Sequence, residues 1–146
     1  MARSDSVSRR ASEPLSSQRI SVNELTGLVV DCAITIHRDL GPGLLESVYE
    51  AILERELIRA GVGVRRQVSV PLEYAGLKFD ESFRADLIVD DRVIVEVKAV
   101  EEMAKAHKRQ LLTYLKLTNL QVGLLVNFGV AMMRDGIVRV VNGFDE

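Results

Sequence analysis

Two acidic residues and a lysine lie in adjacent segments that otherwise have the composition of buried β-strands. Glu96 and Lys98 stand in RVIVEVKAV (residues 92–100), and Asp86 stands in SFRADLIVD (residues 82–90). A strand covered on both faces is a nearly continuous run of valine and isoleucine, and charged side chains are almost never fully buried unless they are paired. These three residues therefore need partners that offset the cost of burying them.

The spacing of these residues predicts that the two acids face each other. A hairpin turn centred on Asp91 places Asp86 directly opposite Glu96, and Arg84 opposite Lys98. Two carboxylates at the cross-strand separation of about 5 Å repel by roughly 3 kcal/mol when the effective dielectric constant is near 20. Either the two basic residues neutralise the acids in a salt-bridged solvent face, or a hard divalent cation binds the carboxylate oxygens.

Strict alternation along the two strands separates an apolar face from a charged one. The apolar face, which we expect to pack on the core, consists of Ala85, Leu87, Val89, Val93, Val95 and Val97. The opposite face consists of Arg84, Asp86, Ile88, Ile94, Glu96 and Lys98. All the charges of the two strands are therefore expected on one side of the sheet.

Two predicted helices carry further polar side chains that could join the acids. Glu46 stands in the first turn of one helix, where a glutamate also stabilises the helix dipole. In a later helix His107, Gln110 and Tyr114 follow one another at three- and four-residue spacing, so they share one stripe. This helix follows the strand of Glu96, and the stripe can pack beside the acids. A solvated edge is the alternative, and for His107 a surface position is equally expected.

The elements that must position these residues follow from hydrophobic periodicity and turn signals. Spacings of three and four predict helices, and alternating or continuous apolar runs predict strands. The expected helices cover residues 23–40, 44–61 and 103–118, and the expected strands cover residues 64–74, 77–79, 82–90, 92–100, 122–129, 131–134 and 137–141, with turns at Ala75-Gly76 and Asp135-Gly136. The order is ααβββαβ followed by a C-terminal hairpin. It predicts an α/β (α+β) fold, a mixed central sheet flanked by helices.

Composition points to one domain whose folded part is acidic. The chain has 146 residues, 47% of them hydrophobic and 27% charged, which suffices for a single core. Residues 1–20 are rich in serine and arginine and are predicted to form a flexible tail, with the domain in residues 21–146. The tail has four arginines against Asp5 and Glu13, so the remaining 126 residues carry a net charge of −4. This balance argues against a protein that binds nucleic acid over its whole surface, and the two acids also weaken an organelle-targeting interpretation.

Several classes of site and location are excluded or left open. The single cysteine, Cys32, rules out an internal disulfide and a cysteine-rich metal site within one chain. No segment approaches the roughly 18 to 20 apolar residues of a membrane span, so we expect a cytoplasmic protein without a membrane partner. A homodimer is left open. Arg65, Arg66, Lys105, Lys108 and Arg109 could contact phosphates, although a solvated charged face is the alternative.

Three motifs in this order resemble a known family. Asp86 followed by Glu96-Val97-Lys98 resembles the signature of the PD-(D/E)XK nucleases, with Ala85 in place of the usual proline. The segment GLLESVY at residues 43–49 resembles the motif of the small bacterial GxxExxY proteins, a branch of that superfamily. The segment QLLTY at residues 110–114 resembles the QxxxY motif of its helicase-linked exonucleases. The likeness covers residues 25–141.

The resemblance implies a restriction-endonuclease-like core and a divalent-metal-dependent nuclease acting on nucleic acid, with DNA as the expected substrate. Asp86, Glu96, the Val97 carbonyl and Glu46 would hold Mg²⁺ or Mn²⁺, and Lys98 would act beside the attacking water. Gln110 and Tyr114 would orient the substrate or the lysine. Two alternatives stay open, because a fold does not guarantee an activity. One is a catalytically silent nuclease-fold module that binds nucleic acid or a protein. The other is a structural subunit of a larger assembly.

Overall fold

A computed structural model describes residues 19–143 of the chain. Most of the predicted tail, residues 1–18, lies outside the described part, so the tail and its boundary with the domain stay predictions. The elements in chain order are α1 (Val22–Leu40), α2 (Glu46–Arg59), β1 (Val64–Tyr74), β2 (Leu77–Val89), β3 (Val93–Lys98), α3 (Lys105–Thr118), β4 (Val122–Asn127), the 3-10 helix η2 (Met133–Asp135) and β5 (Ile137–Val141).

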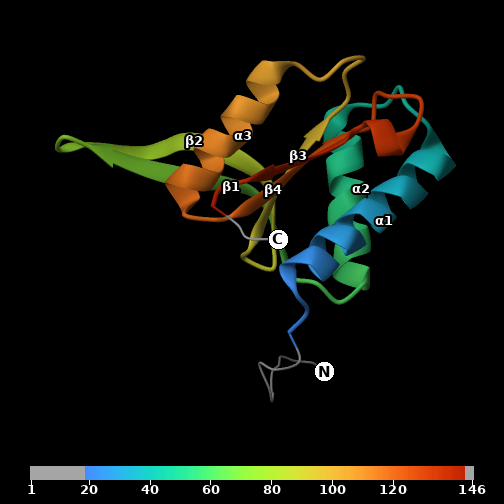
Figure 1. Ribbon diagram of the computed structural model, residues 1–146, viewed down its shortest axis with the longest axis horizontal. Coiled ribbons are helices and arrows are strands. Elements are labelled where there is room, and N and C mark those ends of the chain that lie inside the picture. Colours follow the sequence, from blue (N-terminus) through green and yellow to red (C-terminus); the bar gives the residue numbers. More distant parts are fainter. Residues whose placement is uncertain (1–18, 144–146) are drawn as a thin grey trace.

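The five strands form one mixed sheet in the order β1-β2-β3-β4-β5. β1, β2 and β3 form an antiparallel meander, β3 and β4 are parallel, and β5 returns antiparallel to β4. The parallel pair requires a crossover, which α3 provides (Figure 1). The predicted α+β class and the order ααβββαβ with a final hairpin are confirmed.

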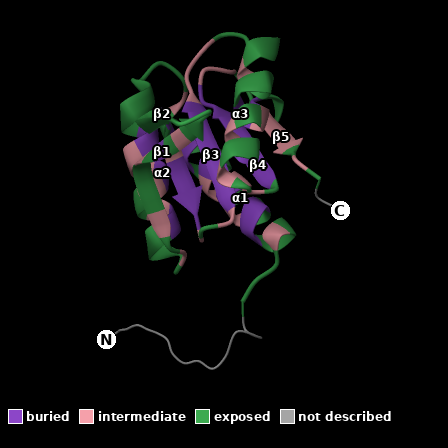
Figure 2. Ribbon diagram, turned by 90° about the vertical axis from the view of Figure 1, so that its left-hand side faces the viewer, coloured by how far each residue is buried: buried purple, intermediate pink, exposed green. Residues whose placement is uncertain are grey.

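Helices cover both faces of the sheet. α1 and α2 pack on one face through a cluster that includes Leu25, Leu53, Val95 and Leu124, and α3 packs on the other face through Leu111 and Leu115. Figure 2 shows that the buried residues are concentrated in β3, β4 and the helix surfaces that face them. β3 is thus covered on both sides, as its valine-rich sequence predicts. No helix of the described part is long and apolar enough to cross a bilayer.

Two details of the predicted strands are wrong. Residues 131–134 were expected to be extended, but Met133 is buried among the helices and begins the 3-10 turn η2. Ala85 was expected beside Leu87, but Ala85 packs in the α3 cluster with Ile88. The partner strand explains this exchange of faces, because Gln67 in β1 has φ = 53° and interrupts the alternation of side chains there.

The outer part of the β1–β2 hairpin forms an arm, residues 71–82, that projects from the body (Figure 1). Its tip is the predicted Ala75-Gly76 turn, whose residues both have positive φ (51° and 85°), as a two-residue hairpin of type I′ requires. The segments predicted at 77–79 and 82–90 join into the single strand β2. Side chains at the tip are largely in solvent, with Tyr74 at 73% and Leu77 at 63% exposure.

Candidate active site

The two strands that carry the acids separate where the acids stand. β2 and β3 pair through Leu87 with Val95, which confirms the register that sets Asp86 opposite Glu96. Beyond this pair, main-chain amides donate to the carboxylates of the two acids and not to carbonyl groups of the opposite strand. The Asp86 N–H donates to Glu96 Oε2 at 2.9 Å, and the Val97 N–H donates to Asp86 Oδ2 at 2.9 Å. The acids are therefore held between the strands by main-chain donors.

Burial and mutual repulsion disfavour the charged forms of this pair. Glu96 is only 5% exposed. Burial, followed by the negative charge of Asp86, raises the pKa of Glu96 to about 8, although the Asp86 amide and the Lys98 charge act in the opposite direction. Burial also raises the pKa of Asp86 to about 6. A positive charge placed between these carboxylates would relieve both effects.

Glu46 reaches the same end of β3 from the start of α2. Its Oε2 accepts from the Ala99 N–H at 3.1 Å, one residue beyond Lys98. Tyr49, one turn later, fixes the loop that precedes the helix. Its hydroxyl donates to the Gly41 carbonyl and accepts from the Leu44 N–H, while its ring stacks on Phe128 with centroids 4.3 Å apart. The GLLESVY segment thus presents Glu46 and anchors itself with Tyr49.

Lys98 is half-buried at the end of β3 and acts on both acids through its charge. Its ammonium forms no ion pair or hydrogen bond within residues 19–143. Arg84, the other residue expected to neutralise the acids, does not do so. Its guanidinium bonds Glu81 at 2.8 Å, three residues earlier on the same strand. Neutralisation of the acids by Arg84, part of one of the two alternatives left open by the sequence, is therefore not found in the structure.

A buried network behind Asp86 was not predicted from the sequence. Glu50 is 5% exposed and accepts from Arg66 Nε at 2.6 Å and from Gln67 Nε2 at 2.9 Å. Gln67 Nε2 also lies 3.3 Å from Asp86 Oδ1. The spacing of Glu46 and Glu50, one helical turn apart, was an available signal. The left-handed backbone of Gln67, which aims its amide at both acids, had no sequence signal.

The three polar residues predicted to share one stripe of α3 have different environments in the structure. Tyr114 is half-buried and stacks on Phe83 with centroids 3.7 Å apart. Its pKa is raised by burial and by the charges of Glu96 and Asp86, so its hydroxyl lies in the field of the acids. Gln110 is exposed and makes no hydrogen bond within the described chain. His107 Nδ1 accepts from the Ala104 N–H at the start of the helix, which is a structural role.

The carboxylates are chemically suited to a hard cation, but they are not grouped as a metal site in the described residues. Glu46, Asp86 and Glu96 each bind one backbone amide, and the second oxygens of Glu46 and Glu96 have no hydrogen-bond donor within the described residues. Carboxylate oxygens are the ligands that Mg²⁺ and Mn²⁺ prefer. Across residues 19–143, however, no group of three or more His, Cys, Asp or Glu side chains is arranged to hold a metal ion. The metal ligands, with the Val97 carbonyl among them, stay predictions.

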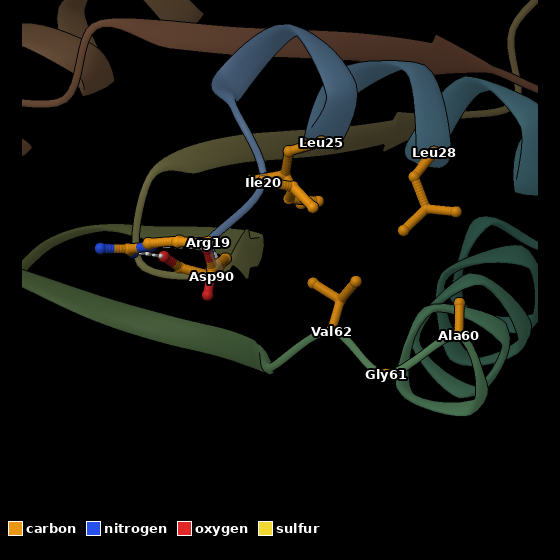
Figure 3. Close-up of a pocket in the computed structure, with 8 residues that line it drawn as sticks. All are labelled: Arg19, Ile20, Leu25, Leu28, Ala60, Gly61, Val62 and Asp90. Carbon is orange, nitrogen blue, oxygen red and sulfur yellow. Dashed lines mark hydrogen bonds and ion pairs between the residues drawn. The ribbon is translucent and has the colours of Figure 1, made fainter. Parts of the chain in front are cut away.

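One pocket of the described chain lies away from the acids. Figure 3 shows a pocket of about 350 Å³ between the start of α1, the end of α2 and the β2–β3 turn. Arg19 and Asp90 close one side of it with a contact of 3.1 Å from Nε to Oδ2. Asp90 lies in the turn that follows β2, four residues along the chain from Asp86. This pocket is therefore separate from the acids.

One of the comparisons with known proteins identifies a family for the chain. No curated protein matches the chain. A crystal structure of the protein SSO0001 aligns with 84% of this chain and 80% of its own, at 17% identity and a TM-score of 0.43, which is too low to bear on the fold. The profile of the PD-(D/E)XK nuclease superfamily matches residues 23–140. Membership of the GxxExxY branch stays a prediction. With the sheet, the separated strands and the D…ExK residues in place, the chain belongs to the PD-(D/E)XK nuclease superfamily.

Proposed function

We propose that the protein is a nuclease that uses Mg²⁺ or Mn²⁺ to hydrolyse phosphodiester bonds in nucleic acid, with DNA as the expected substrate. The observation that carries the proposal is the desolvated pair of Asp86 and Glu96 beside a lysine without an ion partner in the described part. An acid pair of this kind destabilises a protein on its own, whereas a bound cation would make it favourable.

Asp86, Glu96 and the Val97 carbonyl would hold the metal, and Glu46 would contribute from α2. A metal bound there would supply a Lewis acid and lower the pKa of a bound water. The Gln67 amide, which also donates to Glu50, donates to Asp86 from behind the site. The Lys98 ammonium would donate a hydrogen bond to the attacking water or to a phosphate oxygen and stabilise the charge that develops there. Tyr114, and Gln110 one turn before it, would orient the substrate.

The test is cleavage of a supercoiled plasmid and of single-stranded DNA with EDTA, Mg²⁺ or Mn²⁺. We expect the wild-type protein to cleave only with metal, and Lys98→Ala and Asp86→Ala to lower the rate by at least about 100-fold. Lys78→Ala is the matched control, because Lys78 is an exposed lysine of the arm. Thermal unfolding verifies that each variant is folded. Full activity in both site variants would refute the proposal.

A second candidate is a nuclease-fold module that binds nucleic acid without cleaving it. The absence of a three-ligand group in the described residues favours this candidate. Calorimetric titration with Mn²⁺ separates the two. If the wild-type protein binds the ion and Asp86→Ala does not, the nuclease is supported. If neither binds, the silent module is supported.

A further inference from the structure

The outer face of α3 carries a set of cations that the rest of the domain does not neutralise. Residues 105–118 contain four basic residues and no acid, in a chain whose residues 21–146 sum to −4. The four are exposed, and they form no ion pair within the described chain: Lys105, Lys108, Arg109 and Lys116. We call this set the α3 basic face.

Three arginines of α2 and β1 are, in contrast, paired with acids. Arg59 pairs with Glu56 at 3.1 Å, Arg65 with Asp91 at 3.0 Å, and Arg66 with Glu50 at 2.6 Å. Arg65 and Arg66 were candidates for phosphate contacts on sequence grounds, but both are occupied by acids. Lys105, Lys108 and Arg109, the other candidates, stay available.

The position of these cations works against the helix itself. Lys105 and Lys108 lie in the first turn, where positive charge opposes the helix dipole and where the helix has no acidic residue. Lys105 is also three residues from Lys108 and four from Arg109, so like charges adjoin on one face. Glu101 and Glu102 in the preceding loop form no ion pair with them. Helix stability therefore gives no reason for this arrangement, which a polyanionic ligand would explain.

The topology connects the α3 basic face with the candidate active site. The crossover runs from Lys98 through residues 99–104 directly to Lys105, so the start of α3 and the end of β3 lie at the same end of the sheet (Figure 1). Three of the four cations lie within the first five residues of the helix. The distance along the helix axis from Lys105 to Lys116 is about 16 Å, close to five base-pair steps of duplex DNA.

We infer that the α3 basic face binds the phosphate backbone of a duplex and leads it to the acids of the active site. The inference rests on the proposed function for the identity of the ligand. A duplex is favoured over a single strand because binding of single strands relies on exposed aromatic rings. In α3 the ring of Tyr114 is stacked on Phe83, and the ring of His107 is hydrogen-bonded to the Ala104 N–H. The contacts carry no base specificity, because they are made by charge alone.

The experiment measures binding without cleavage. Full-length protein in EDTA is titrated into a fluorescent 20-base-pair duplex and into one of its single strands, at several salt concentrations between 50 and 300 mM. The test variant is K105Q/K108Q/R109Q, in which glutamine keeps the helix propensity and Asp86, Glu96 and Lys98 stay intact. The control is R55Q/K78Q/R134Q, which removes the same charge from three exposed cations that lack an ion pair in residues 19–143.

We expect the wild-type protein to bind the duplex more tightly than the single strand, with a slope of log K against log salt near −3 for three or four phosphates. The test variant should lose about two to three units of that slope and at least about tenfold in affinity at 100 mM salt, while the control loses less than one unit. Equal losses in the two variants, an unchanged slope in the test variant, or tighter binding of the single strand would each overturn the inference. Loss of cleavage in Lys98→Ala with an unchanged slope in the test variant would leave the nuclease and remove only this inference.

Discussion

The charge on Glu96 is controlled by the protein around it rather than by solvent. Burial and the neighbouring Asp86 disfavour its carboxylate form, so the domain without a cation is stabilised by a protonated Glu96. The sequence was sufficient to predict this pair, because a short turn centred on Asp91 fixes which residues oppose each other. It was not sufficient for Glu50 and Gln67, whose contact depends on how α2 packs against β1.

The raised pKa of Glu96 predicts how metal-free stability changes with pH. Its pKa of about 8 in the folded protein exceeds the value of 4.5 for an unperturbed glutamate. This stabilisation is therefore complete below about pH 4.5 and is lost as the pH rises from there through 8. We expect Glu96→Gln to be more stable than wild type by about 2 to 4 kcal/mol at pH 8.5 in EDTA, and to differ little at pH 4.5. Urea unfolding at both pH values measures the difference, with Asp80→Asn as a surface control. A less stable Glu96→Gln at pH 8.5 would contradict the pKa argument.

At the scale of elements, one asparagine connects β4 to the loop that carries the site. Asn127 is 1% exposed. Its side chain accepts from the Val100 and Gly129 N–H groups and donates to the Val100 carbonyl at 2.9 Å. These hydrogen bonds fix the backbone at Val100, two residues after Lys98. The elements themselves were predictable from periodicity, but such loop contacts and the 3-10 turn at Met133 were not, because they form only when distant segments meet.

Two glycines of this region should respond differently to alanine. A Cβ at Gly129 would lie 2.4 Å from the Val100 carbonyl oxygen, which is backbone and cannot move aside. A Cβ at Gly123 would lie 2.9 Å from a methyl of Leu111, which can change rotamer. We expect Gly129→Ala to reduce the free energy of unfolding by about 3 kcal/mol or more, and Gly123→Ala by about 1 kcal/mol. Urea unfolding of the two variants measures both losses of free energy. If Gly129→Ala loses less than Gly123→Ala, the loop after Lys98 must move to accommodate the added methyl group.

At the scale of the whole molecule, the domain is a sheet covered by helices on both faces, with the arm of β1 and β2 as its one uncovered part in the described residues. The strand order and the two helical layers follow from the order of the elements, since a parallel pair needs a crossover helix. The sequence could not show that β1 and β2 continue past the body as an arm. The position of the helices decides where the covered part of the two strands ends, and a β-strand pattern does not encode that position.

The arm should contribute little to stability. Its tip buries little surface, and an isolated two-stranded hairpin is at best marginally stable in water. We expect replacement of residues 73–78 by Asn-Gly, which keeps a two-residue turn between Leu72 and Phe79, to change the free energy of unfolding by less than about 1 kcal/mol. Urea unfolding of the shortened and full-length proteins provides the comparison. A loss above about 3 kcal/mol would mean that the arm packs on the body.

The three acids at the end of β3 are each attached to a different main-chain amide, those of Asp86, Val97 and Ala99. The chemical shift of an amide proton depends on the oxygen that accepts its hydrogen bond. Each carboxylate is therefore reported by the resonance of a different amide. A nitrogen-15 spectrum recorded during a Mn²⁺-free Mg²⁺ titration would therefore reveal the sequence in which the carboxylates respond, one peak for each.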